Sequence, residues 1–260
     1  MFYKLSLDLH ILHRYFRPCL SGYSLGYAFL VLVILASASC ANKQTVIKPA
    51  KEYYDNAVVF MDKKQYQASI EEFDQLQTFH PLSPYARVSE LEKIAANYGF
   101  GAYEDTAYLA QRFIDFYPDS SQLDFAYYMK GRAEYAQGVV LIDRFDERQL
   151  ATAKTAYNTF SQLVVAFPDS QYFAESHAHM RHIRNILARD EIITARYYFK
   201  RFSYVAAINR CVNILQNFPG TPYNLEALSI MEASYLKLGW DEQAAKVAEA
   251  YKNNAGLYEQ

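Results

Sequence analysis

Glycine and proline are scarce in this chain, with 9 and 8 among 260 residues, and there is a single tryptophan. Few residues therefore break a helix or force a turn, which favours a helical protein. The other two aromatic residues are abundant, with 24 tyrosines and 17 phenylalanines. The chain is also long enough to bury a sizeable core around these large side chains.

Excess charge of one sign is missing as well. The formal net charge is -2, and acidic and basic residues are interspersed along the chain. No global field attracts nucleic acid, and no basic stripe or RNA-binding motif occurs. We therefore expect no nucleic-acid partner.

Cysteine is too rare and too scattered for a disulfide framework. The three cysteines are Cys19, Cys40 and Cys211, and no pair has the spacing of a metal site. Cys211 has apolar neighbours in a helical pattern. This predicts a small buried side chain in preference to a catalytic thiol.

No apolar run reaches the length of a transmembrane helix, which needs about 20 residues. The longest run, Leu25 to Ala36, follows Lys4, Arg14 and Arg17 and precedes Ser37-Ala38-Ser39. A basic leader, a short apolar run and small residues, in this order, are typical of an export signal. A permanent membrane span is the alternative.

The small residues directly before Cys40 resemble a bacterial lipoprotein signal. In that family the cysteine is lipidated and becomes the first mature residue, which predicts Cys40 as the lipidation site. Ser37 stands where such signals usually carry leucine, and an unprocessed chain would keep the apolar run as its anchor. Ala41 is not the aspartate that favours retention at the inner membrane, so the resemblance implies outer-membrane delivery.

Four turns with an aromatic residue or histidine before proline recur along the chain, at Pro81, Pro118, Pro168 and Pro219. The residues 5, 8, 12 and 15 positions before each proline are mostly apolar or small. Because these offsets differ by three or four, each set lies on one face of a helix that ends before the proline. The four faces are Leu76, Phe73, Ser69 and Tyr66; Phe113, Ala110, Thr106 and Tyr103; Leu163, Phe160, Ala156 and Ala153; and Ile214, Cys211, Ala207 and Tyr204.

The pattern resembles the second helix of a tetratricopeptide repeat, most clearly in GAYEDTAYLAQRF from Gly101 to Phe113. KLGWDEQAAKV, from Lys237 to Val247, resembles a fifth repeat. We predict an all-α, tetratricopeptide-repeat-like solenoid of about ten helices in five repeats. The predicted helices are Ala50 to Phe60, Gln65 to Phe79, Pro84 to Gly99, Tyr103 to Phe116, Ser121 to Gln137, Glu147 to Ala166, Gln171 to Phe199, Ser203 to Asn217, Pro222 to Leu238 and Asp241 to Asn254.

The predicted organisation follows from these elements. Residues 1–39 are a signal peptide, residues 40–49 a polar tether and residues 50–256 the five-repeat solenoid. The groove of a solenoid lined with tyrosine and phenylalanine suits an extended peptide or a partner segment. The alternative is that these aromatic side chains simply fill the core.

Two features invite a chemical interpretation. His177, His179 and His182 form the histidine cluster, with Glu175 one turn before His179, and a zinc site is conceivable. A wet helix surface is the favoured alternative, because zinc needs three or four ligands and no further one can be placed. The charged run from Asp143 to Arg148 suits a salt-bridged loop and helix start better than an acid/base pair.

Motifs for phosphate binding and nucleophilic catalysis are absent from the sequence. We therefore expect no enzyme, no cofactor and no metal.

The leader, the tether and the repeats together closely resemble the BamD (ComL-like) family of outer-membrane assembly lipoproteins. The resemblance covers nearly all of residues 51–254. Its most specific pieces are HPLSPYA, FYPDS, AYYMKGRA, DRFDERQLATAKTAYNTFSQLV, FPDSQY, ARYYFKRFSYVAAINR and AAKVA.

The resemblance implies a non-enzymatic, lipid-anchored scaffold on the periplasmic side of the cell outer membrane, within the β-barrel assembly machine. Residues 139–254 would hold the periplasmic domains of an Omp85-type barrel subunit. Residues 50–135 would meet the signals of unfolded outer-membrane proteins, and other assembly lipoproteins would join. A periplasmic repeat adaptor for peptidoglycan synthesis is the alternative function.

The resemblance also implies individual site residues. Arg201 and Arg210 match family arginines at or near the partner-facing region. His80 and Ser83 replace the usual tyrosine and glycine of the groove turn, and Gln67 stands where a basic residue is often found. The substrate-peptide groove residues implied in this way are His80, Pro81, Ser83, Pro84 and Tyr85.

Overall fold

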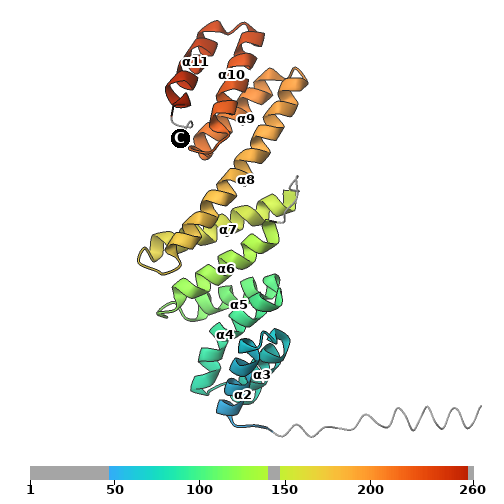
Figure 1. The fold of residues 1–260 in the computed structure, drawn as a ribbon, viewed down its shortest axis with the longest axis vertical. Coiled ribbons are helices and arrows are strands. Elements are labelled where there is room, and N and C mark those ends of the chain that lie inside the picture. The colour runs from blue at the N-terminus through green and yellow to red at the C-terminus, as the bar shows by residue number, and fades with distance from the viewer. Residues whose placement is uncertain (1–46, 140–146, 257–260) are drawn as a thin grey trace, which may run out of the picture. The chain divides into compact units, whose positions relative to one another are not determined.

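The computed structural model describes residues 47–139 and 147–256 of the chain. Met1–Ile47 and Lys48–Gln260 form separate units, and every helix of the described residues belongs to the second. The described residues form ten helices and no strands (Figure 1). The helices are α2 (Ala50–Asp62), α3 (Tyr66–Phe79), α4 (Pro84–Phe100), α5 (Tyr103–Phe116), α6 (Leu123–Gly138), α7 (Glu147–Ala166), α8 (Phe173–Lys200), α9 (Tyr204–Asn217), α10 (Asn224–Leu238) and α11 (Asp241–Ala255).

The predicted all-α fold is confirmed. The predicted helical faces are confirmed too, since all sixteen residues are buried or half-buried in the structure. The signal peptide, residues 40–46 of the tether and residues 143–146 of the charged run lie outside the described residues.

The second helices of the first four pairs, α3, α5, α7 and α9, each end two residues before a proline. The intervening aromatic or histidine residue donates its backbone N–H to the carbonyl four residues back, at 2.8 to 2.9 Å. These capping residues are His80, Tyr117, Phe167 and Phe218. Because a proline disfavours helical conformation in the residue before it, the helix stops here.

The capping side chains of the first three pairs turn back to the first helix of their own pair. The ring of His80 lies 6.0 Å from the ring of Tyr53 in α2. The Tyr117 hydroxyl donates to Glu90 in α4 at 2.8 Å, and the ring of Phe167 lies 6.0 Å from that of Tyr127 in α6. The repeated motif therefore ends one helix and fixes it against its neighbour.

Three helices begin two residues later than predicted: α6, α8 and α10. In each case the chain first makes a turn held by a hydroxyl side chain. Ser120 and Ser170 accept hydrogen bonds from the N–H groups of Gln122 and Tyr172, at 3.2 and 3.1 Å. Such local side-chain bonds compete with helix formation and delay it.

Four of the five pairs are joined by the same short turn, a Schellman motif, with a left-handed residue just after the first helix. The left-handed residues are Lys64, Gly101, Phe202 and Gly239, with φ of 57°, 87°, 61° and 71°. Each donates its N–H to the carbonyl three residues back, and the next residue donates to the carbonyl five residues before itself. The segment that joins the remaining pair, α6 and α7, includes residues 140–146, which lie outside the described residues.

The first helices contact one another in sequence, from α2 through α4, α6 and α8 to α10. Among the described residues, the second helices contact only first helices. This is the stacking expected of a helical repeat array, in which each unit buries its apolar face against its neighbours.

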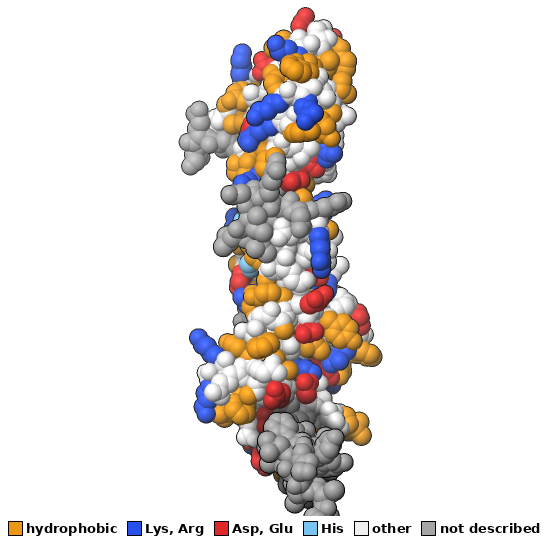
Figure 2. All heavy atoms as spheres, turned by 90° about the vertical axis from the view of Figure 1, so that its right-hand side faces the viewer, with side chains coloured by type: hydrophobic (Ala, Val, Ile, Leu, Met, Phe, Trp, Pro, Cys, Tyr) orange, Lys and Arg blue, Asp and Glu red, His pale blue; other side chains and the backbone are white. Residues whose placement is uncertain are grey.

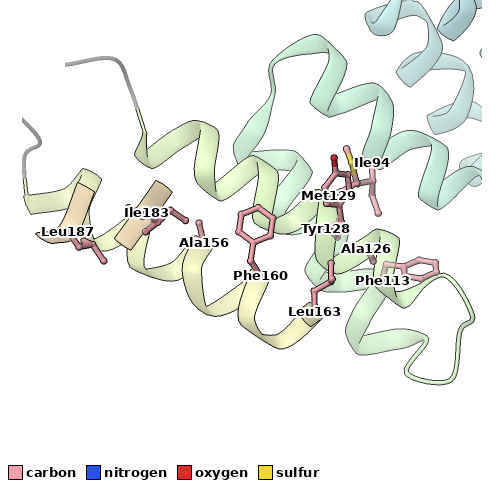
Figure 3. Packing of buried hydrophobic residues seen from close by; sticks show 12 residues of the cluster. Ile94, Phe113, Ala126, Tyr128, Met129, Ala156, Phe160, Leu163, Ile183 and Leu187 are labelled. Atoms are coloured by element: carbon pink, nitrogen blue, oxygen red, sulfur yellow. The ribbon is translucent and has the colours of Figure 1, made fainter. Parts of the chain in front are cut away.

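The 28-residue helix α8 joins two core clusters. Ile183 and Leu187 belong to the cluster shared by α4 to α8, and Ile192 and Ala195 belong to the cluster shared by α8 to α11. Figure 3 shows the first cluster, in which Phe160 of α7 is packed among residues of neighbouring helices. A helix of this length spans about 42 Å, enough to take part in both cores.

Candidate functional site

The turn between α3 and α4 holds the residues predicted for the substrate-peptide groove. The Nε2 atom of His80 lies 2.8 Å from the backbone carbonyl oxygen of Lys48, which precedes α2. Lys48 in turn forms an ion pair of 2.8 Å with Glu72 in α3. The hydrogen bond that Lys48 donates to the Glu72 carboxylate raises the pKa of Lys48. His80 therefore fastens the start of the array to this turn.

The next residues of the turn start α4. The hydroxyl of Ser83 accepts a hydrogen bond from the backbone N–H of Tyr85 at 3.2 Å, and Pro84 occupies the first helical position. This is a well-formed helix start, because proline lacks an N–H and serine satisfies one of those left unpaired. The half-buried ring of Tyr85 lies 5.4 Å from that of Tyr54 in α2.

Exposure separates the residues of this turn into two kinds. His80, Ser83 and Tyr85 are half-buried and hold the turn together, whereas Pro81 and Pro84 are exposed. Leu82, which the sequence did not single out, is 98% exposed. A free apolar side chain next to proline is the part of this turn that offers contact area to another chain.

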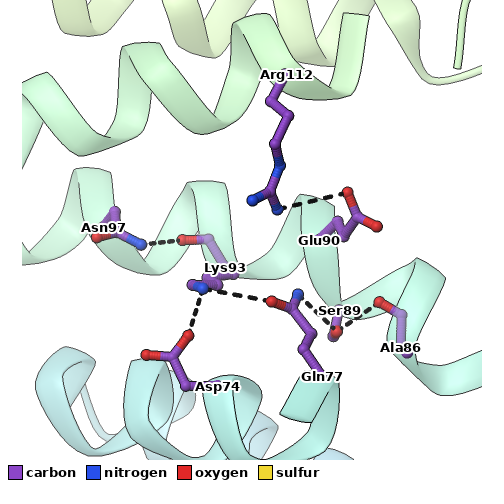
Figure 4. A network of polar contacts seen from close by, with 8 residues as sticks. All are labelled: Asp74, Gln77, Ala86, Ser89, Glu90, Lys93, Asn97 and Arg112. Carbon is purple, nitrogen blue, oxygen red and sulfur yellow. Dashed lines mark hydrogen bonds and ion pairs between the residues drawn. The ribbon is translucent and has the colours of Figure 1, made fainter. Parts of the chain in front are cut away.

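A polar network behind the turn fixes α4 between its neighbours (Figure 4). Lys93 of α4 forms an ion pair with Asp74 of α3. Gln77 of α3 donates to the hydroxyl of the buried Ser89 at 3.3 Å, and Arg112 of α5 lies 3.9 Å from Glu90. The orientation of the turn is thus determined by contacts on three helices.

Arg210, one of the two predicted partner-binding arginines, lies on α9. Its Nη1 atom is 3.2 Å from Oε2 of Glu191 in α8, and this hydrogen bond raises the pKa of Arg210. The neighbouring Asp190 has a raised pKa because of burial and then of repulsion from Glu191. Arg210 also lines a shallow hollow of about 310 Å³, with Tyr198, Ala206, Asn209 and Asn213.

Arg201, the second predicted arginine, follows α8 directly. Its guanidinium carbon lies 5.0 Å from the centre of the Tyr197 ring, in a cation–π arrangement. Tyr197 contacts the ring of Tyr198 edge-on, with 5.7 Å between the ring centres. Since Tyr198 lines the hollow beside Arg210, a pair of tyrosines connects the two arginines.

A larger cleft of about 620 Å³ lies between the α4–α5 turn and the start of α7. Exposed Glu104 and Asp105 lie on one side, and exposed Arg148, the last residue of the charged run, lies on the other. Sequence reasoning missed this cleft, because its residues come from segments more than 30 positions apart. The cleft is lined by Gly101, Ala102, Tyr103, Glu104, Asp105, Gln137, Arg148, Gln149 and Thr152.

Of the histidine cluster, His179 is half-buried between helices, whereas His177 and His182 are exposed. The ring of His179 stacks on Phe160 of α7, with 5.0 Å between ring centres, and lies 4.4 Å from Tyr135 of α6. The hydroxyl of Tyr135 lies 2.6 Å from Nδ1 of His182, and His177 stacks on Phe173. No group of three or more metal-ligating side chains occurs among the described residues.

Hydrophobic side chains gather in several patches on the face drawn in Figure 2, with basic and acidic side chains among them. This agrees with the interspersed charges of the sequence. Within the part of the chain that the structure covers, no helix is both long and apolar enough to cross a membrane.

Comparison with known proteins identifies the family. The family model YfiO, described as an outer membrane lipoprotein, matches residues 47–250. The chain belongs to the YfiO family of outer membrane lipoproteins. The match begins at the first described residue and ends within α11, so it takes in all five helix pairs.

Relatives of this YfiO-family chain carry the name outer membrane protein assembly factor BamD, which confirms the family predicted from the sequence. The chain is 34% identical to the BamD of Pasteurella multocida, with 88% of this chain and 91% of the relative covered. It is 29% identical to the BamD of Neisseria meningitidis serogroup A, with 85% and 87% covered. The BamD of Rickettsia prowazekii is 26% identical, with 84% and 86% covered.

Among solved structures, the YfiO-family chain is similar to the TPR2AB domain of yeast Sti1. The TM-score is 0.45 at 12% identity, with 78% of this chain and 76% of that chain covered. The assignment of the repeat fold depends on the helix pairs described above. Cys40 precedes both the family match and the described residues, so its lipidation stays a prediction.

Proposed function

We propose that this chain is a lipid-anchored scaffold subunit of the machine that assembles β-barrel proteins in the outer membrane. The observation that carries the proposal is the family match over all five helix pairs, with relatives named as outer membrane protein assembly factors. The role is non-enzymatic: the protein holds other chains and brings them together. Cys40, lipidated, anchors it at the periplasmic side of the membrane.

The C-terminal helices bind the periplasmic domains of the Omp85-type barrel subunit. Arg201 and Arg210 support this assignment, because both project from the α8–α9 region and are exposed. Arg210 is held by Glu191 with part of its side chain open, so it can reach a carboxylate on a partner. Pre-positioned arginines are frequent at the centres of protein interfaces. Other assembly lipoproteins join the same complex.

The N-terminal helices receive the signals of unfolded outer-membrane proteins. The α3–α4 turn supports this assignment, because Leu82 and Pro81 are exposed on a turn whose base is fixed by His80 and Ser83. A rigid turn loses little conformational entropy when an extended apolar peptide docks on it.

Affinity purification of the full-length chain from detergent-solubilised membranes tests the proposal. We expect stoichiometric recovery of an outer-membrane barrel subunit with periplasmic repeats. Recovery of peptidoglycan-synthesis proteins without any barrel partner would support the alternative adaptor function and contradict this one.

Mass spectrometry of the mature N-terminus tests the anchor. We expect the mature chain to begin at an acylated Cys40, and Cys40→Ala to release the protein from membranes. Stable attachment needs two or more acyl chains, since one chain alone binds only marginally. A Cys40→Ala chain that stays fully membrane-bound would indicate an uncleaved apolar anchor.

A further inference from the structure

Phe202 occupies a backbone position that suits glycine. It is the left-handed residue of the Schellman turn between α8 and α9, with φ of 61°. The same position holds Gly101 and Gly239 in two other turns, where the missing Cβ removes the steric conflict. A bulky side chain with positive φ is an outlier, and local strain of this kind gathers at functional sites.

The fold does not explain the aromatic ring at this position. The side chain of Phe202 is 78% exposed, so it adds little to the core. The turn is closed instead by Phe199 and Tyr204, whose rings meet edge-on at 5.6 Å. The ring of Phe202 lies 6.4 Å from that of Tyr204, on the solvent side of this pair. Among the described residues, therefore, burial of the ring does not offset the backbone strain.

The surroundings of the ring are apolar and basic. Tyr197 and Val205 are 52% and 50% exposed, and Lys200 and Arg201 are exposed beside them. Among the described residues, neither Lys200 nor Arg201 has a carboxylate within 4.0 Å, whereas the nearby Arg196 pairs with Glu226. The stacking of Arg201 on Tyr197 fixes one face of its guanidinium group and leaves its donors available.

We propose that Tyr197, Lys200, Arg201, Phe202 and Val205 form a docking surface, the α8–α9 knob, for a protein partner. The ring of Phe202 enters an apolar hollow on that partner, and carboxylates at the rim of the hollow meet Lys200 and Arg201. This inference rests on the proposed function, which supplies the partner: the periplasmic part of the barrel subunit. It adds an anchor residue and a complementary acidic chemistry to that contact.

A protein fits the knob better than a lipid surface does. Binding to anionic membranes draws on a broad amphipathic face or on clusters of about four to eight basic residues. The knob has two cations around one projecting ring. Aromatic residues and arginine are enriched at protein interfaces, where a few side chains contribute most of the binding energy.

If the α8–α9 knob is a docking surface, one substitution should raise the stability of the protein and weaken its binding. Phe202→Gly removes both the strain and the anchor. We expect the melting temperature of the full-length protein to rise by about 2 to 4 °C. We expect its affinity for the detergent-solubilised barrel subunit, measured by biolayer interferometry, to fall about thirty-fold.

Lys64→Gly is the matched control, because Lys64 has the same left-handed position in the α2–α3 turn. It should raise the melting temperature similarly and leave the affinity unchanged. Phe202→Trp should retain most of the affinity, since it keeps an aromatic anchor. Arg201→Gln should weaken binding about ten-fold and reduce its dependence on salt, because one charge pair is lost.

The outcomes separate this inference from the proposed function. If the wild-type chain does not bind the barrel subunit, the proposed function itself is wrong. If the wild-type chain binds and Phe202→Gly binds equally well, the knob is wrong and the proposed function stands. A fall in melting temperature for Phe202→Gly would show that the ring serves the fold, which also contradicts the knob.

A photo-crosslink identifies what covers the ring. Phe202→p-benzoylphenylalanine keeps an aromatic side chain and reacts with its neighbour in intact cells. An adduct with the barrel subunit supports the proposal. An adduct of phospholipid mass, without protein, would assign the knob to the membrane surface and overturn it.

Discussion

Arg210 of α9 and Glu191 of α8 are joined across the helix pair, with 3.2 Å between Nη1 and Oε2. The arginine side chain is 44% exposed and the glutamate 18%, so the pair is open on the arginine side. Ion pairs this exposed contribute little to stability, about 1 kcal/mol or less. The arrangement therefore orients Arg210 more than it stabilises the fold.

The first prediction concerns this arginine. Arg210→Leu should weaken association with the barrel subunit about ten-fold or more, while the far-ultraviolet circular dichroism spectrum stays unchanged. Arg196→Leu is a suitable control, since Arg196 is also paired with a glutamate across helices, Glu226. Equal binding by the wild type and Arg210→Leu would remove Arg210 from the partner site.

The second prediction concerns the close approach of α6 and α7. A Cβ atom added at Gly138 would lie 2.7 Å from the backbone nitrogen of Ala153, which cannot yield easily. Gly138→Ala should therefore lower the free energy of unfolding by about 1 to 3 kcal/mol, as overpacking does. Urea denaturation measures this change.

The control for that experiment is Gly256→Ala. A Cβ atom at Gly256 meets nothing within 4 Å, and its φ of -66° suits any residue. This variant should change stability by less than about 0.5 kcal/mol. A Gly138→Ala protein as stable as the wild type would mean that α6 and α7 are less tightly packed than described.

The third prediction concerns His179 and pH. Burial against Phe160 and Tyr135 lowers the pKa of His179, and Glu175 opposes the shift only partly. Arg132 and His182 also disfavour its charged form. The unfolded chain therefore gains a proton at higher pH than the folded chain does. Stability should fall as pH drops through about 6.5, the usual histidine value, towards the lower folded pKa.

His179→Phe should abolish that part of the pH dependence, because phenylalanine keeps the ring contacts and carries no titrating group. Urea denaturation at pH 7.5 and at pH 5.5 compares the two proteins. The hydrogen bond that Tyr128 donates to Glu175 lowers the pKa of Glu175. The titration of Glu175 therefore affects stability below pH 4.5, outside the range from pH 5.5 to 7.5 that is compared. Equal losses of stability in both proteins would contradict the role assigned to His179.

The fourth prediction concerns Cys211. Its side chain is fully buried, and desolvation raises the pKa of the thiol to about 12. The thiolate is the reactive form, so labelling by a maleimide at pH 8 should be slower about a thousand-fold or more in the folded protein than in urea. Peptide mass mapping reports the label at this position. Rapid labelling without denaturant would mean that α9 opens readily.

The repeat fold was readable from the sequence because its determinants are local. The four prolines fix where α3, α5, α7 and α9 end, and the spacing of three and four residues before them fixes the buried face. Phe73 and Leu163, predicted on these faces, are 0% exposed. The sequence placed the start of α6 two residues too early. The Ser120 hydroxyl accepts a hydrogen bond from the N–H of Gln122, which stabilises a turn before the helix begins.

The candidate site was only partly readable. His80, Ser83 and Pro84 were found by resemblance to a family turn, but their contacts to Lys48 and Tyr85 hold that turn together. Leu82 and Phe202 were overlooked, since nothing in a sequence says that a leucine or a phenylalanine is exposed. For Phe202, the clue in the sequence is its place two residues before the tyrosine of a repeat, where Gly101 stands in another repeat.

The sequence by itself determined the helices, their order and the family, because helix periodicity, proline and short turns act over a few neighbouring residues. Only the tertiary structure decided which side chains remain free. Glu191 meets Arg210 across 19 positions of the chain, whereas Arg201 has no carboxylate within 4.0 Å among the described residues. Exposure and pairing depend on how separate helices pack, and a linear pattern does not contain that information.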